Sequence, residues 1–154
     1  MEEQSQRYLN KYLSSLSETE RKRYQSFSSD YFCTDEYNAN LCAELIHSGQ
    51  KTATCSLNAW YESGKESMPT VGHLQVVVDW NGQPICIIEI DSVEMCKYNE
   101  VTADFAYAEG EGDRSLKWWR EAHWNYFLTE CLDFHIQPSE EMILVLERFH
   151  VVYQ

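Results

Sequence analysis

The sequence predicts a single α+β domain in which a small mixed or antiparallel β-barrel is flanked by helices. Its 154 residues are close to the usual size of one domain. Its β-prone runs cluster around a strong hairpin signal at Asn81-Gly82. Helical stretches fill the gaps between these runs, and this order of elements argues against a doubly wound parallel sheet.

Three helices and a strand are predicted in the first part of the chain. Two short helices are expected between residues 7 and 26, because apolar residues recur there at helical spacing and Ser17 with Glu20 forms a capping-box pattern. A helix over residues 34–47 follows, with Thr34 as its N-cap and Gly49 as its C-cap. Residues 52–57 are then β-prone.

The second half of the chain predicts a hairpin, two helices and a final strand. Strands are expected over residues 73–80 and from Ile85 to about Tyr98, on either side of the Asn-Gly turn. Asn99 is expected to open a short helix over residues 100–108. Ser115 is expected to cap a long helix that ends near Leu132, and residues 142–149 form the last strand.

Composition narrows the classes of function. The hydrophobic content of 44% supports a folded core, and no apolar run approaches the ~18 residues that a membrane span needs. The N-terminus is acidic and lacks the features of a secretory signal, so we expect a cytoplasmic protein that does not contact membranes. The six cysteines form no CxxC pair and the five histidines no HExxH motif, so we expect reduced thiols, no metal and no cofactor.

The formal net charge of −13 argues against a long nucleic-acid duplex as partner. Duplex binding depends on clustered lysine and arginine side chains that contact phosphates. A local basic pocket can still operate on an acidic surface, so we expect a nucleoside-like small ligand or a short single-stranded RNA as partner. The sequence leaves the oligomeric state open.

Two segments concentrate polar chemistry. Residues 49–54, Gly-Gln-Lys-Thr-Ala-Thr, place a lysine and two hydroxyl groups where a helix ends and a strand begins. Residues 109–113, Glu-Gly-Glu-Gly-Asp, place carboxylates between glycines that permit close approach to a ligand. The simpler interpretations are a helix C-cap followed by a solvated lysine, and a flexible acidic turn that serves the N-terminus of the next helix.

A mixed cationic and aromatic segment follows the acidic turn. Arg114, Lys117, Arg120 and His123 could supply a local cationic strip. They lie among three tryptophans, which we expect to be mostly core, with one at the wall of a cleft as a possible stacking surface for a base.

These motifs together resemble the ASCH domain family, specifically its longer bacterial members. The resemblance covers roughly residues 24–153 and rests on GQKTAT, on the hairpin region SMPTVGHLQVVVDWNGQPICIIEIDSVEM and on VTADFAYAEGEGDRSLKWWREAH, in that order. It implies a PUA-like β-barrel over residues 24–154, related to RNA-binding modules, with residues 1–23 as a helical extension packed on it. It also implies a cleft lined by the lysine-containing segment and the acidic turn.

The resemblance further implies residues for a site. Short members of the family hydrolyse the amide of N4-acylated cytidines with a lysine, a threonine and a glutamate, which match Lys51, Thr54 and Glu111. The surrounding residues implied as substrate-binding are Thr52, Glu109, Arg114, Trp119 and Arg120. The chain differs from the short members in its N-terminal helices and in residues 118–123, so the substrate stays open.

Two physical conditions follow for this site. A lysine accepts the proton of a threonine hydroxyl only if its pKa falls from ~10.4 toward neutrality. Burial lowers that pKa and a nearby Glu111 raises it, and the sequence leaves the balance open. Residues three apart on an ideal strand face opposite sides, so we predict either a bulge or a strand that starts after Lys51.

Three functional hypotheses result. The first is a hydrolase of a modified nucleoside or a related small amide, with Thr54 as nucleophile, Lys51 as base and Glu111 as proton donor or orienting group. The second is a non-catalytic RNA- or nucleotide-binding module in which Lys51 holds a phosphate. The third is a single-strand endoribonuclease in which Lys51 stabilises the phosphorane.

Overall fold

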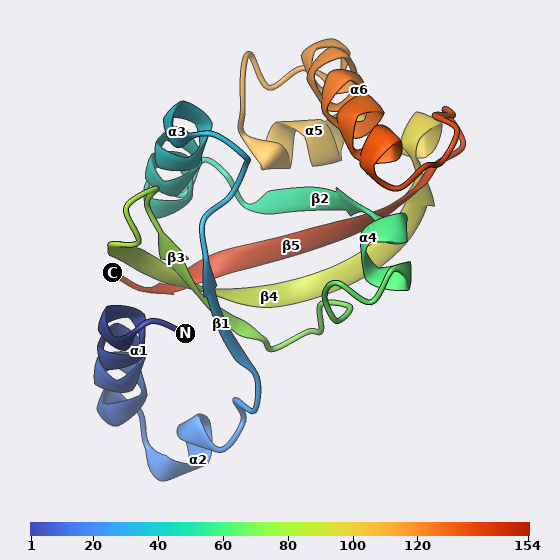
Figure 1. Cartoon of the computed structure of the whole chain (residues 1–154). Helices are drawn as coiled ribbons and strands as arrows, with labels where there is room; N and C mark the ends of the chain where they lie inside the picture. Colours follow the sequence, from blue (N-terminus) through green and yellow to red (C-terminus); the bar gives the residue numbers. More distant parts are fainter.

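The computed structural model describes residues 1–154. Figure 1 shows the arrangement of its elements. The helices are α1 (Glu3–Ser15), α2 (Glu18–Arg21), α3 (Glu36–His47), α4 (Asn58–Glu62), α5 (Ala103–Glu109) and α6 (Leu116–Asp133), with a 3₁₀ turn η1 (Tyr98–Glu100). The strands are β1 (Phe27–Asp30), β2 (Ala53–Leu57), β3 (Leu74–Val78), β4 (Pro84–Lys97) and β5 (Ile143–Tyr153). No helix combines the length and the apolar character that crossing a bilayer requires.

The strands form one mixed sheet in the order β1-β3-β4-β5-β2. β1 pairs with β3 in parallel and every other pairing is antiparallel, which confirms the predicted α+β class with a small mixed sheet. The edge strands β1 and β2 do not pair with each other, so the barrel is open between them. β4 carries register shifts against β5 at Ile87/Ile88 and at Ile90/Ser92, and such bulges bend a strand.

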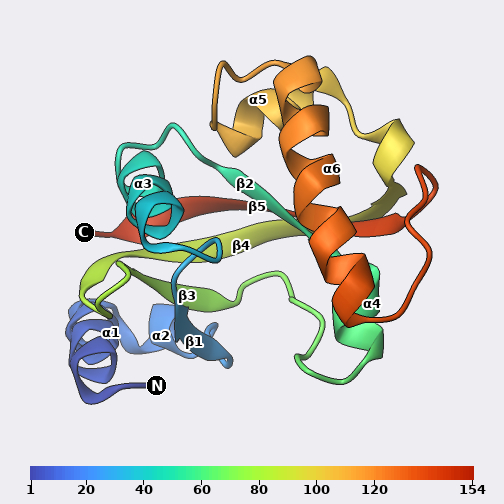
Figure 2. The same cartoon turned by 45° about the horizontal axis from the view of Figure 1, so that its top comes forward.

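Helices cover the sheet in separate places. Leu9 and Tyr12 of α1 pack against the β3 residues Leu74 and Val76. Further along the sheet, α5 and α6 share the largest apolar cluster with β2 and β5, while α3 packs on β3, β4 and β5. Figures 1 and 2 show α1 and α2 at one end of the molecule and α5 and α6 at the other, with the long β4 and β5 running between them.

The N-cap residues that the sequence predicts are the observed ones in two of four helices. Ser17 and Glu20 form the capping box of α2, and the Ser115 side chain accepts a hydrogen bond from the backbone of α6. The N-cap of α3 is Asp35, one residue after the predicted Thr34, and its carboxylate accepts from Asn38 N. The helix predicted from residue 100 instead begins at Ala103, because Thr102 provides the cap after the 3₁₀ turn.

Two elements were not predicted. β1 is the four-residue segment Phe-Ser-Ser-Asp, which has no apolar alternation, and it exists because β3 offers a free edge to pair with. α4 contains five residues directly after β2. Both elements are too short to leave a periodic pattern in the sequence.

Candidate functional site

The lysine-containing segment and the acidic turn lie side by side. Thr52 N donates to Ala108 O at 2.8 Å, and Gln50 Nε2 donates to Gly110 O at 2.8 Å. β2 starts at Ala53, so the prediction that the strand begins after Lys51 is confirmed. Lys51 is therefore free of the strand alternation that would place it on the face opposite to Thr54.

The two glycines of the acidic turn are required by close contacts. Gly110 has φ 73°, and a Cβ there would lie 2.5 Å from Gln50 O. Gly112 has φ 60°, and a Cβ there would lie 2.2 Å from the Trp118 ring. Positive φ values and contacts this short exclude side chains, so these glycines bring the carboxylates of the turn against Lys51.

Lys51 is a buried ammonium group between two acidic residues. The residue is 2% exposed. Its Nζ donates to Glu111 Oε2 at 3.0 Å and to the backbone carbonyl of Glu109 at 3.4 Å. Burial lowers the pKa of Lys51, but the charges of Glu109 and Glu111 together outweigh it and the pKa is raised. The protonated form of Lys51 is therefore favoured.

Glu109 and His123 complete a charge-balanced cluster with Lys51 and Glu111. Glu109 is 1% exposed, and its Oε2 lies 2.9 Å from His123 Nε2. Burial raises the pKa of Glu109, but the charges of Lys51 and His123 lower that pKa by more than burial raises it. The ionised carboxylate is therefore favoured. The pKa of His123 is raised, because the charge of Glu109 outweighs the effect of burial. His123 Nδ1 bonds the Trp119 carbonyl at 2.8 Å, which leaves Nε2 directed at Glu109.

The carboxylate of Glu109 has unused hydrogen-bonding capacity. Its ion pair with His123 is close but poorly aligned, and neither of its oxygens accepts a hydrogen bond of good geometry from the protein. Buried polar groups without such a partner are uncommon in folded proteins. A ligand with an N–H or O–H donor would satisfy these oxygens.

A cavity of about 400 Å³ opens on this cluster. It contains both Lys51 and Thr54, so the structure brings the two predicted catalytic residues to one site. Trp118 forms part of its wall and is the tryptophan that reaches the cavity. The lining residues are Phe32, Cys33, Thr34, Asp35, Asn38, Lys51, Thr54, Cys55, Glu109, Glu111, Trp118, Ala122, His123 and Tyr126.

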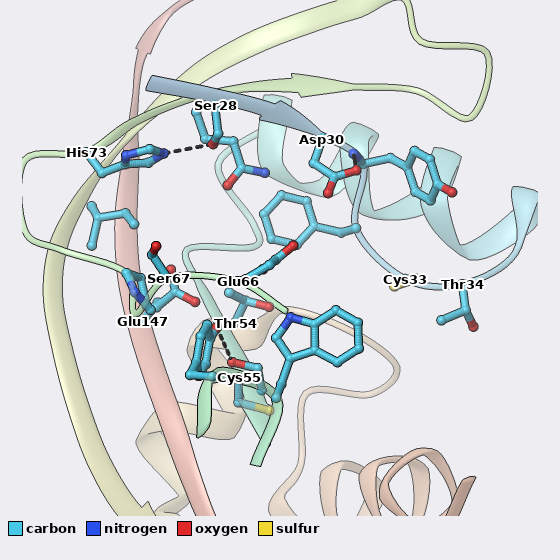
Figure 3. A pocket seen from close by; sticks show the side chains of 18 of the residues that line it. Ser28, Asp30, Cys33, Thr34, Thr54, Cys55, Glu66, Ser67, His73 and Glu147 are labelled. Atoms are coloured by element: carbon cyan, nitrogen blue, oxygen red, sulfur yellow. Dashed lines mark hydrogen bonds between the residues drawn. The ribbon is translucent and has the colours of Figure 1, made fainter. Parts of the chain in front are cut away.

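A second cavity, of about 730 Å³, lies between β1 and β2 and shares Thr54 and Cys33 with the first. Its charged lining is acidic and contains no lysine or arginine: Asp30, Glu66, Glu130 and Glu147. Figure 3 shows Asp30, Glu66 and Glu147 around this hollow together with Thr54. Glu147 is the partner of Thr54 in the β2–β5 ladder, and burial raises the pKa of Glu147 to about 7.

Several predicted substrate-binding residues serve other contacts. Thr52 Oγ1 donates to Ala108 O at 3.3 Å and so holds the two segments together. Arg114 lies over the Tyr107 ring and donates to Tyr107 O and Gln50 O. Trp119 is 1% exposed and stacks on His123 beneath the cavity, whereas Arg120 lines a separate hollow beside Tyr98 and Trp124. Of the predicted site residues, the structure therefore places four on the wall of the smaller cavity: Lys51, Thr54, Glu109 and Glu111. The other four do not line it: Thr52, Arg114, Trp119 and Arg120.

Two groups of side chains have donor atoms of the kind that bind zinc. They are Cys33 with Cys42 and Glu111, and Cys55 with Glu109 and His123. In both groups Lys51 already contacts the acidic residue: its ammonium group donates to the carboxylate of Glu111 and to the backbone carbonyl of Glu109. A divalent cation at either position would have to compete with that charge for the carboxylate.

The structure adds functional candidates that the sequence analysis did not assign to the site. His123 was expected only in a cationic strip, but it pairs with Glu109 across two helices. Glu147 follows the apolar run at the start of the final strand, and its register opposite Thr54 reveals its position. A charged residue directly after an apolar run in a strand is a signal that could have marked it.

A family model and one solved structure identify the same family. An ASCH domain model matches residues 28–153. The crystal structure of an ASCH domain from Lactobacillus crispatus is 60% identical, with a TM-score of 0.97 over 100% of this chain and 97% of that chain. A protein from Enterococcus faecalis, assigned to the DUF984 family, is 31% identical, with a TM-score of 0.77 over 96% of this chain and 85% of that one.

More remote comparisons add only the fold. A hypothetical protein that is 13% identical has a TM-score of 0.52 over 83% of this chain and 100% of its own. No curated protein matches the chain. The α+β fold is thus of the PUA-like class. The chain belongs to the ASCH domain family, as its motifs predicted.

Proposed function

We propose that this protein hydrolyses the amide of a small N-acylated nucleoside of the N4-acylcytidine type. The observation that carries the proposal is the cavity that contains Lys51, Thr54, Glu109 and Glu111. It combines a hydroxyl nucleophile, a lysine–carboxylate pair and a buried carboxylate that lacks an aligned donor. An amide substrate supplies an acyl carbon for the hydroxyl and an N–H donor for a carboxylate.

The lysine–carboxylate pair supports a defined route for the protons. The raised pKa of Lys51 favours its protonated form, so it becomes a base only when its proton moves to Glu111 across their 3.0 Å hydrogen bond. The resulting amine accepts the Thr54 proton as the hydroxyl oxygen attacks the acyl carbon. Glu111 then donates its proton to the leaving amine, and a water molecule hydrolyses the acyl-threonine.

The charge of the larger cavity favours a small uncharged ligand over an RNA strand. The ASCH domain family is a PUA-like family thought to bind RNA. The larger cavity, however, presents four acidic residues and no lysine or arginine, and the chain has a net charge of −13. A phosphate backbone would be repelled along this path, whereas a neutral nucleoside would not.

The test is the release of cytidine from N4-acetylcytidine by the purified protein. We expect turnover by the wild type and none by Lys51→Ala or Thr54→Val, with Thr54→Val still binding the substrate. Lys97→Ala is the matched control, because Lys97 also pairs with a glutamate but lies partly exposed on β4. Its rate should equal that of the wild type.

The alternative outcomes separate the remaining functions. No cytidine release, combined with salt-dependent binding of a short single-stranded RNA, would replace the hydrolase by an RNA-binding module. Cleavage of that strand, lost in Lys51→Ala, would instead establish the endoribonuclease. A full rate in Thr54→Val would remove the covalent threonine step.

A further inference from the structure

Two cysteines lie in contact beside the Lys51–Glu111 pair. Cys33 Sγ and Cys42 Sγ are 3.2 Å apart. A disulfide bond requires about 2.05 Å, so a shift of about 1 Å would join them. Cys33 belongs to the loop between β1 and α3, whereas Cys42 is a buried residue of α3. Residues 31–34 belong to no strand or helix, so a shift of Cys33 does not itself break one.

The two sulfurs have the different surroundings that a redox pair requires. Cys33 is exposed and lines both cavities, so an oxidant in solution can reach it. Figure 3 shows it on the loop at the edge of the larger cavity. The hydrogen bond from Cys42 lowers the pKa of Cys33, which favours the thiolate. An accessible sulfur of low pKa next to a second thiol is typical of cysteines that sense oxidants.

Cys42 links this pair to the charged cluster. Its Sγ donates to Glu111 Oε1 at 3.6 Å, on the carboxylate whose other oxygen accepts from Lys51. A thiol carries a single hydrogen, so Cys42 supports either Cys33 or Glu111 at one moment. A disulfide removes that hydrogen altogether and leaves Glu111 with Lys51 as its close donor.

We propose that Cys33 and Cys42 are a modification site, where a peroxide converts the two thiols into a reversible disulfide that reduces the activity of the cavity. The Cys33 thiolate attacks one oxygen of hydrogen peroxide, which forms a sulfenic acid and releases hydroxide. That hydroxide takes the Cys42 proton and becomes water, and the Cys42 thiolate attacks the Cys33 sulfur, which forms the S–S bond and releases hydroxide. The two thiols are oxidised and the peroxide is reduced, and a dithiol reductant reverses the change.

The effect on the cavity follows from the position of the loop. Phe32, Cys33 and Thr34 all line the smaller cavity, so drawing Cys33 toward α3 displaces part of its wall. The same step removes the Cys42 donor from Glu111. This consequence for activity rests on the proposed hydrolase function, whereas disulfide formation does not.

The formation of the disulfide is tested by peptide mass after treatment with hydrogen peroxide. Trypsin cleaves after Arg23 and Lys51, and the peptide of residues 24–51 contains Cys33 and Cys42 and no other cysteine. After peroxide, removal of the oxidant and denaturing alkylation, we expect this peptide to be unlabelled and two hydrogens lighter than the reduced peptide. Dithiothreitol should restore both labels. Peptides with two labelled thiols, or with Cys33 as sulfinic acid and Cys42 still labelled, would overturn the proposal.

Variants and a rate measurement complete the test. Cys33→Ser should leave Cys42 fully labelled after peroxide, while Cys96→Ser, a control on β4, should form the disulfide as the wild type does. Turnover of N4-acetylcytidine should fall about tenfold on oxidation and return with dithiothreitol. An unchanged rate in a fully oxidised sample would refute the regulatory part. Absence of turnover in the reduced sample would refute the proposed hydrolase, and the peptide masses would still decide whether the disulfide forms.

Discussion

Glu109 and Glu147 are two carboxylates in adjoining cavities, and their pKa values move in opposite directions. Glu109 is the more deeply buried, yet its pKa is lowered, because Lys51 and His123 lie beside it. Glu147 faces a cavity without lysine or arginine, and burial followed by the charge of Glu66 raises its pKa to about 7. Burial alone therefore does not decide ionisation here. The presence of a cation within the same cavity does.

The opposite pKa shifts of Glu109 and Glu147 distinguish two kinds of cavity beside one sheet. The smaller cavity holds compensated charges, which can orient a polar substrate and exchange protons over short distances. The larger cavity holds uncompensated acid, which repels anions and favours neutral groups. Thr54 stands at the boundary, because it lines both.

The largest effect is expected from removing the shared cation. Lys51→Met keeps most of the side-chain volume but leaves Glu111 without its counter-charge and Glu109 with His123 alone. Breaking a buried ion pair by removing one partner costs about 3–5 kcal/mol, and we expect a fall of that size in the free energy of unfolding at neutral pH. Urea denaturation measures it.

A matched lysine provides the control for this experiment. Lys97→Met removes a partly exposed ion pair with Glu141 and should change the free energy of unfolding by less than about 1 kcal/mol. Adding Glu111→Gln to Lys51→Met should recover part of the loss, because the carboxylate that Lys51 paired with is then neutral. Equal effects of Lys51→Met and Lys97→Met would contradict the charge-balanced cluster.

Replacing Glu147 in the larger cavity is expected to have a smaller effect, and to raise the free energy of unfolding instead of lowering it. The folded-state pKa of Glu147 is about 7, above the unfolded value, so the folded protein holds a proton that the unfolded chain has lost. Stability from this group is complete below about pH 4.3 and decreases as the pH rises toward 7. Glu147→Gln should remove this decrease of the free energy of unfolding with pH. At pH 8 the variant should be more stable than the wild type by about 1–3 kcal/mol. Urea denaturation of both proteins between pH 5 and 8 measures this difference in stability. If Glu147→Gln were less stable than the wild type at pH 8, the ionised carboxylate of Glu147 would be stabilising the fold.

The smallest effect is expected from His123. Its pKa is raised in the folded state, so its contribution is complete below the unfolded value of about 6.5 and is lost as the pH rises through the higher folded value. His123→Gln should be less stable than the wild type by about 1 kcal/mol at pH 6, and the gap should narrow at alkaline pH. Thermal unfolding at both pH values measures it. A gap that widens with pH would mean that His123 is neutral beside Glu109.

Much of the fold could be predicted from local patterns. The stripe of apolar residues in α6 has its buried members at Trp119, Phe127 and Cys131, and the Asn-Gly turn does connect β3 and β4. Lys51, Thr54 and Glu111 were found through motifs and do share a cavity. β1 could not be predicted, because its pairing with β3 depends on an edge that exists only after the sheet has formed.

The sequence by itself determined the class of fold, the caps of α2 and α6 and the candidate site residues, because periodicity, capping and motif spacing are local properties of the chain. The tertiary structure decided which charges meet: Glu109 with His123, Cys33 with Cys42, and Thr54 with Glu147. It also decided that the pKa of Lys51 is raised despite its burial. The physical reason is that a pKa depends on desolvation and on charges within a few ångströms, and those neighbours come from segments far apart in the sequence.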